Sequence, residues 1–202
     1  MIAVLDYGIG NLRSAQKALE HVGADARLTA DPAEVEAADG VVLPGVGAFG
    51  PCIEALRETG LERPARQAID AGTPFLGICI GMQMLYEGSE ENPTTPGMGV
   101  LEGCVRRLPD GVKRPQMQWN RLDRRAGSPM FDGLDEPTWV YFVHSYAPET
   151  GADVVATCDY GGPVVAAVAR GPLWATQFHP EKSSATGLRL LANFVAATAR
   201  AG

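Results

Sequence analysis

The chain has 202 residues, of which 46% are hydrophobic and 20% are charged. This composition is that of a globular protein with a sizeable core, and it excludes an intrinsically disordered chain. The net charge of -7 argues against a nucleic-acid surface, which needs a basic stripe, and no apolar run approaches the ~20 residues that span a bilayer. We therefore expect neither nucleic acid nor a membrane as a partner.

Short apolar runs alternate with amphipathic segments over residues 1–90. We expect strands at residues 2–6, 26–29, 40–44 and 74–79. Helices are expected from Asn11, after Asp31-Pro32, and at residues 51–58, 61–71 and 81–87. This alternation predicts a sheet of parallel strands with helices on both faces.

The second half of the chain changes character, because apolar runs there are separated by Pro and Gly rather than by helices. Strands are expected at residues 100–108, 117–122, 139–143, 154–158, 164–169 and 173–178. Residues 89–97 are expected to form an exposed loop, and residues 184–199 a closing helix. The whole pattern predicts one α/β domain over residues 1–202. Its central sheet is mostly parallel and flanked by helices, with extra antiparallel strands at one side.

The four cysteines are Cys52, Cys79, Cys104 and Cys158. Their spacings form neither a CxxC pair nor a zinc-site pattern, so we expect free thiols, no metal and no other cofactor. Free thiols favour the cytoplasm as the compartment.

Cys79 is the cysteine with informative neighbours, in the run Gly77-Ile78-Cys79-Ile80-Gly81. A Gly-x-Cys-x-Gly run between a predicted strand and a predicted helix has the form of a nucleophile elbow. The sulfur would then lie at a helix N-terminus, which favours thiolate over thiol. The alternative is that Cys79 is an inert buried cysteine, as we expect for the other three.

A thiol nucleophile needs a base, and the chain has three histidines. His179 stands in the run Gln177-Phe178-His179-Pro180-Glu181, where Pro180 predicts an extended segment that turns His179 and Glu181 to the same side. Glu181 could then orient the imidazole as the third member of a catalytic triad. The alternatives are a solvated histidine before a capped helix, or His144 as the base. We expect His21, at a helix end, to be structural.

The glycine-rich run PGVGAFG at residues 44–50 follows a predicted strand and precedes a helix. Because its backbone amides can approach a substrate closely, it is our candidate oxyanion hole. It lacks the Gly-Lys-Ser/Thr of a phosphate-binding loop. A second run, at residues 8–10, is similar to the start of a dinucleotide-binding loop, but Arg13 stands where the third glycine would be.

The three motifs PGVGAFG, GICIGMQ and QFHPEKS together resemble those of the class I glutamine amidotransferases, whose fold is flavodoxin-like. The runs DYGIGNLRS and YFVHSY narrow the resemblance to the glutaminase subunits of imidazole glycerol phosphate synthases. The resemblance implies that Cys79 attacks the glutamine side chain, that His179 transfers the proton and that Glu181 orients it. It also implies that the oxyanion and the glutamine are bound at Gly45, Val46, Gly47, Ile80, Gln83, His144, Ser145 and Tyr146.

The same resemblance implies a partner, a (β/α)8-barrel cyclase subunit that receives the ammonia in a heterodimer. Trp119, Tyr141 and Lys182 match family positions at that interface. Where members often have Pro-His-Met-Gly-Trp-Asn, this chain has Gln116 in place of the histidine and Gln118 in place of the glycine. Rival functions are the glutaminase of another biosynthetic complex, a stand-alone cysteine hydrolase, or an inactive glutamine-binding module.

Overall fold

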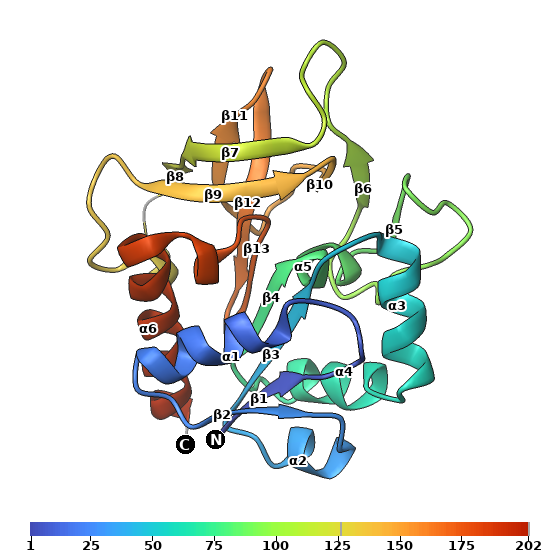
Figure 1. Ribbon diagram of the computed structural model, residues 1–202, viewed down its shortest axis with the longest axis vertical. Coiled ribbons are helices and arrows are strands. Elements are labelled where there is room, and N and C mark those ends of the chain that lie inside the picture. Colours follow the sequence, from blue (N-terminus) through green and yellow to red (C-terminus); the bar gives the residue numbers. More distant parts are fainter. Residues whose placement is uncertain (126, 202) are drawn as a thin grey trace.

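The computed structural model describes residues 1–125 and 127–201 and is shown in Figure 1. In chain order the first elements are β1 (Ile2–Leu5), α1 (Leu12–His21), β2 (Ala26–Thr29), α2 (Pro32–Glu36), β3 (Gly40–Gly45), α3 (Phe49–Glu58), α4 (Glu62–Asp70), β4 (Phe75–Cys79), α5 (Ile80–Met84) and β5 (Gly88–Ser89). The later elements are β6 (Cys104–Arg107), β7 (Gln116–Arg121), β8 (Asp123–Arg124), η1 (Pro129–Phe131), β9 (Trp139–His144), β10 (Tyr146–Pro148), β11 (Val154–Asp159), β12 (Pro163–Arg170), β13 (Leu173–Thr176), η2 (Pro180–Lys182) and α6 (Ser184–Ala201).

A central eight-stranded sheet has the order β2-β1-β3-β4-β13-β12-β11-β8. The first five of these strands are parallel to their neighbours, and the pairings from β13 to β8 are antiparallel. This confirms the predicted α/β domain with a mostly parallel sheet and extra antiparallel strands. Strands β1, β3, β4 and β13 are buried along their whole length because helices cover both faces of the sheet, whereas the edge strand β2 is partly exposed.

The helices form two layers around the sheet. On one side α1 packs against α6, whereas on the other α3 packs against α5, and α2 packs against α4. In α1 the buried residues are Leu12, Ala15, Ala18 and Leu19, which recur at the spacing of one helical face. Asp31 caps α2 by accepting a hydrogen bond from the Ala33 amide, as the Asp-Pro pair predicts.

The order of the sheet places two distant parts of the chain side by side. Strand β13 pairs in parallel with β4, with Ala175 opposite Gly77 and Thr176 opposite Ile78. The residues that follow the two strands therefore leave the same edge of the sheet. This carboxyl edge is where open α/β sheets form their binding sites.

Two small sheets lie beyond that edge, at the top of Figure 1. Strands β7 and β9 form an antiparallel ribbon, in which Trp119 pairs with Tyr141, and β10, β6 and β5 form a second sheet. The ribbon buries Val140 and Phe142 toward the core and leaves Trp119 on its outer face. None of the helices in the described ranges is long and apolar enough to cross a membrane.

Three predicted elements differ from the observed ones. The strand predicted at 100–108 is confined to β6, because Gly99 and Gly103 have positive φ and residues 100–103 turn instead. Helix α5 ends at Met84 rather than at residue 87. The loop at 89–97 is not simply exposed, since Ser89 is buried in β5 and the residues after it contact α3.

Candidate active site

Cys79 lies at the junction of β4 and α5 and has the strained backbone of a nucleophile elbow. Its φ of 55° and ψ of -109° fall in a region that residues with a side chain rarely adopt. The turn needs Gly81, because a Cβ there would overlap the carbonyl oxygen of Leu43. Gly45 approaches equally closely, since its Cβ would lie 2.7 Å from the Gly81 nitrogen. The Gly-x-Cys-x-Gly motif and the glycine loop therefore fit against each other.

Three hydrogen bonds that connect Tyr141, His179 and Ser183 hold the backbone of His179 beside this elbow. Its N–H donates to the Tyr141 carbonyl at 3.0 Å, and its carbonyl accepts from the Ser183 hydroxyl at 2.6 Å. The Ser183 oxygen in turn accepts from the Tyr141 amide at 3.0 Å. Ribbon strand β9 thus fixes the position of the histidine relative to Cys79.

The carboxylate of Glu181 contacts the imidazole of His179, with 2.7 Å between Oε1 and Nδ1. The contact is as predicted, but the reason given for it is wrong. Residues 180–182 form the one-turn helix η2 rather than an extended segment, and only His179 itself has extended backbone angles. The turn, rather than the alternation of a strand, brings the carboxylate back to the ring.

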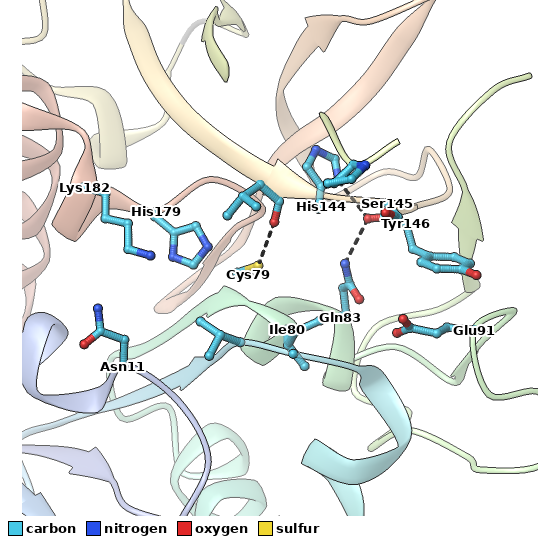
Figure 2. Close-up of a pocket in the computed structure, with 14 residues that line it drawn as sticks. Asn11, Cys79, Ile80, Gln83, Glu91, His144, Ser145, Tyr146, His179 and Lys182 are labelled. Carbon is cyan, nitrogen blue, oxygen red and sulfur yellow. Dashed lines mark hydrogen bonds between the residues drawn. The ribbon is translucent and has the colours of Figure 1, made fainter. Parts of the chain in front are cut away.

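The other ring nitrogen of His179, Nε2, is buried and has no hydrogen-bond partner within the described residues. Figure 2 shows the ring beside Cys79, with both side chains facing the same space. Burial disfavours the imidazolium, but the adjacent thiol of Cys79 and then Glu181 outweigh it and raise the pKa of His179 to about 9. The site therefore favours an imidazolium at His179, beside the sulfur of Cys79.

This arrangement predicts a pH dependence that isolates the contribution of Cys79. The pKa of His179 is raised from 6.5 to about 9, so protonation of this ring stabilises the folded protein. This contribution to the free energy of unfolding is complete below pH 6.5 and is lost as the pH rises through about 9. In a Cys79→Ala variant the pKa of His179 is expected to fall, since the neighbouring thiol that raises it is gone. An NMR titration of the His179 ring checks this result. Equal pKa values in the two proteins would show that the thiol does not interact with the imidazole.

A cavity of about 350 Å³ opens over the two side chains. Its lining contains ten of the residues that the sequence analysis named, which are Val46, Gly47, Cys79, Ile80, Gln83, His144, Ser145, Tyr146, His179 and Lys182. Gly45 does not line the cavity and instead lies opposite Cys79 in the pairing of β3 with β4. Four lining residues were not predicted, and these are Asn11, Glu91, Pro115 and Val143.

Glu91 is the charged residue among those four. Its Oε2 accepts a hydrogen bond from the Phe49 amide at 2.8 Å, and Asn92 accepts from the Gly50 amide at 2.9 Å. The two side chains cap α3, whose N-cap residue Ala48 offers no side-chain hydrogen bond. Figure 2 shows Glu91 and Tyr146 at one end of the cavity and Asn11 and Lys182 at the other. One signal in the sequence could have indicated Glu91. Ala48, the residue before α3, cannot cap the helix with its side chain, so the free N–H groups of the first turn need an acceptor from another segment.

The ring of His144 is engaged on both nitrogens. Nδ1 lies 2.8 Å from the Tyr146 carbonyl, to which it donates, and Nε2 lies 3.0 Å from the side-chain Oε1 of Gln116, an amide that donates to a neutral ring when it is flipped. Burial is the main cause that lowers the pKa of His144 to about 4. A neutral ring without a free nitrogen is unsuited to take a proton from Cys79, so the geometry favours His179 as the base.

Two buried glutamines connect this region to the nucleophile. The amide nitrogen of Gln83 donates to the Tyr146 carbonyl at 2.9 Å and to the side-chain oxygen of Gln177 at 3.0 Å. The amide nitrogen of Gln177 lies 3.6 Å from the sulfur of Cys79. Gln83 thus keeps a buried oxygen, Oε1, without a partner in the described part of the chain. A buried acceptor left open beside a cavity is suited to a donor group on a ligand.

The residues predicted at a partner interface lie close to the cavity. Trp119 and Tyr141 pair edge to face on the outer side of the ribbon, with ring centroids 6.2 Å apart, and Lys182 is on η2. Gln116 is fully buried and bonded to His144, so it does not face a partner, whereas Gln118 is exposed. Of the two departures from the family pattern, Gln118 is therefore the exposed one, and it pairs with Phe142 on the face of the ribbon opposite to Trp119.

All four cysteines are free, and Cys79 is buried at the foot of the cavity. Among the described residues, no three His, Cys, Asp or Glu side chains form a group that could hold a metal ion. The cavity instead combines a strained cysteine, an oriented histidine and a glycine loop. The fold and this arrangement define an enzyme of the class that attacks a carbonyl carbon with a cysteine.

Residues 3–198 match the family model described as "Glutamine amidotransferase class-I". The chain is 50% identical over 195 residues to the "Imidazole glycerol phosphate synthase subunit HisH" of Symbiobacterium thermophilum, covering 96% of this chain and 92% of the relative. It is 51% identical to the HisH subunit of Synechococcus sp. (strain JA-3-3Ab), covering 98% and 94%. A solved structure titled "Crystal structure of glutamine amidotransferase" has a TM-score of 0.75 and 25% identity over 98% of each chain. The chain therefore belongs to the class I glutamine amidotransferases, and among them to the HisH family.

Proposed function

We propose that this chain is the glutaminase subunit of an imidazole glycerol phosphate synthase, acting in histidine biosynthesis. It hydrolyses glutamine to glutamate and ammonia and delivers the ammonia to a cyclase subunit. The observation that carries the proposal is the meeting of Cys79 and His179 at one cavity, with Glu181 bonded to the imidazole, in a chain half identical to HisH subunits. The four free thiols are compatible with a cytoplasmic location.

In the first half of the reaction, the thiolate of Cys79 attacks the side-chain amide carbon of glutamine. The carbonyl π electrons move to the oxygen, and backbone N–H groups of the glycine loop and of Ile80 stabilise the resulting oxyanion. The imidazolium of His179 then gives its proton to the leaving nitrogen. The carbon–nitrogen bond breaks, ammonia departs and a γ-glutamyl thioester on Cys79 remains.

In the second half, His179 is neutral and takes a proton from an attacking water molecule. The water oxygen bonds to the thioester carbon, the carbon–sulfur bond breaks, and glutamate leaves with the thiolate and the imidazolium restored. Glu181 holds the imidazole through Nδ1 in both halves, which keeps Nε2 directed at the reacting atoms.

Substrate binding uses the remaining walls of the cavity. The His144-Ser145-Tyr146 stretch supplies backbone groups, and Gln83 offers the acceptor Oε1 to a nitrogen of the substrate. The carboxylate of Glu91 at one end suits the α-ammonium group of glutamine. Glutamine is selected over glutamate because a buried open acceptor disfavours a second carboxylate.

The partner in this proposal is a (β/α)8-barrel cyclase subunit in a heterodimer. Ammonia reacts there with a phosphoribulosyl formimino aminoimidazole carboxamide ribotide, giving imidazole glycerol phosphate and the aminoimidazole carboxamide ribotide. The outer face of the β7–β9 ribbon is the proposed docking surface. Met117, Trp119 and Trp139 are 60%, 45% and 47% exposed there, and such aromatic exposure is typical of interfaces.

A covalent probe and a turnover assay test the proposal together. A chloroketone analogue of glutamine is expected to alkylate Cys79 with loss of chloride, which mass spectrometry detects. Glutamate release is expected to be slow for the chain alone and strongly stimulated by the cyclase with its ligand, because an uncoupled glutaminase would waste glutamine. Equal turnover with and without the cyclase would identify a stand-alone hydrolase, and labelling without any turnover would identify an inactive binding module.

A further inference from the structure

Two buried side chains hold the carbonyl groups of the glycine loop. Tyr7, which follows β1, is 2% exposed, and its hydroxyl donates a hydrogen bond to the Pro44 carbonyl at 2.6 Å. Cys52 in α3 is fully buried, and its thiol donates to the Val46 carbonyl at 3.3 Å. The two bonded carbonyls lie on either side of Gly45, whose register partner is Cys79.

Both side chains are suited to remain donors. Burial is the main cause that raises the pKa of Cys52 to about 11, and burial also raises the pKa of Tyr7. The hydroxyl and the thiol are therefore protonated at neutral pH and each has a hydrogen to donate. Because both donate to the same loop, we refer to them as the Tyr7–Cys52 pair.

The loop that this pair contacts cannot fix its own conformation. Gly47 has a φ of 102°, and glycine adopts many backbone angles at little cost. Because a peptide unit is planar and trans, holding the Val46 carbonyl toward α3 also directs the Gly47 N–H the opposite way. Val46 and Gly47 line the same cavity as Cys79. The rotation of this peptide therefore determines where the loop presents its N–H groups.

We propose that Tyr7 and Cys52 are positioning residues, which hold the glycine loop so that its N–H donors face the oxyanion formed on the substrate. The inference rests on the proposed glutaminase function. A donor that is preplaced costs no reorganisation when the oxyanion forms, whereas a loop that samples several rotations presents its donors for part of the time. The pair touches neither the substrate nor the sulfur and acts through the loop.

The test compares Tyr7→Phe and Cys52→Ala in the complex with the cyclase and its ligand. Each substitution removes a hydrogen-bonding group with little change of shape. The kcat for glutamine hydrolysis is expected to fall about tenfold to a hundredfold, because the oxyanion forms in the transition state. The KM for glutamine is expected to change less than about twofold, since the ground state does not use these donors. Cys52→Ser is expected to recover most of the loss, because its hydroxyl also donates.

Two reference variants make the outcome decisive. Tyr86→Phe removes another buried tyrosine hydroxyl, outside the cavity lining, and is expected to keep the parent kcat. Three outcomes would overturn the positioning role. The first is a parent-like kcat in both Tyr7→Phe and Cys52→Ala, the second is a raised kcat in either variant, and the third is an equal fall of kcat in Tyr86→Phe. Cys79→Ala, assayed alongside, tests the function itself. If it retains glutamine hydrolysis, the proposed function fails, whatever the Tyr7–Cys52 pair does.

Discussion

Replacing Cys79 with alanine is expected to abolish glutamine-dependent synthesis by the complex with the cyclase, while synthesis from added ammonia continues. The substitution removes the atom that forms the thioester, and losing a covalent nucleophile costs at least about 10⁴-fold in turnover. Ammonia enters the reaction after that step, so the cyclase does not need the thiol. Rates of imidazole glycerol phosphate formation with glutamine and with an ammonium salt measure the two activities.

Cys104→Ala provides the matched control for this experiment. Cys104 is a free cysteine that does not line the cavity, and its amide bonds the Glu149 carboxylate outside the site. This variant is expected to keep both activities. If Cys79→Ala instead loses ammonia-dependent synthesis as well, Cys79 supports the structure of the complex rather than the chemistry, and the proposed mechanism is wrong.

The parallel half of the fold could be predicted from the sequence because its signals are local. Strand β2 was predicted with its observed bounds, and Asp31-Pro32 marked the start of α2 as expected. The elbow at Cys79 was equally readable from its local motif, a Gly-x-Cys-x-Gly run between a strand and a helix. Short-range sterics and periodicity were sufficient for these elements.

Other parts of the site depend on contacts between residues far apart in the chain, which no local pattern encodes. Glu91 was assigned to an exposed loop, yet it caps α3 and lines the cavity, because the loop folds back over a helix that lacks its own cap. Cys52 was taken as inert, although its thiol bonds the glycine loop. The contact between His179 and Glu181 was predicted for the wrong reason, since Pro180 begins a helical turn rather than an extended run.

The ribbon of β7 and β9 connects the proposed docking surface to the candidate active site. One edge of β9 supplies the Tyr141 carbonyl that holds the backbone of His179, while the Tyr141 ring pairs with Trp119 on the outer face. The Val143 carbonyl lies 4.0 Å from the sulfur of Cys79. A partner that binds the outer face therefore contacts the same strand that positions the nucleophile and its base.

A Trp119→Asp substitution is accordingly expected to separate the chain from the cyclase without unfolding it. The indole is about half exposed in this chain alone, so its loss costs little internal packing, whereas a carboxylate buried in an apolar interface is unfavourable. Truncating a central aromatic anchor weakens binding by about 2 kcal/mol or more, which is about thirtyfold in Kd. Glutamine-dependent synthesis at subunit concentrations near the parent Kd is expected to fall in proportion.

Gln67→Asp is the control, because it introduces the same charge at an exposed position of α4, remote from the ribbon in Figure 1. Calorimetric titration with the cyclase compares the Kd values of the two variants and the parent, and thermal unfolding confirms that each variant is folded. If Trp119→Asp binds the cyclase with the affinity of the parent, the outer face of the ribbon is not the docking surface. The ammonia of the proposed reaction would then have to leave by another face, although the ribbon holds the backbone of His179 through the Tyr141 carbonyl. The expected stimulation of glutamine hydrolysis by the cyclase would then have to reach His179 through contacts other than the Tyr141 hydrogen bond.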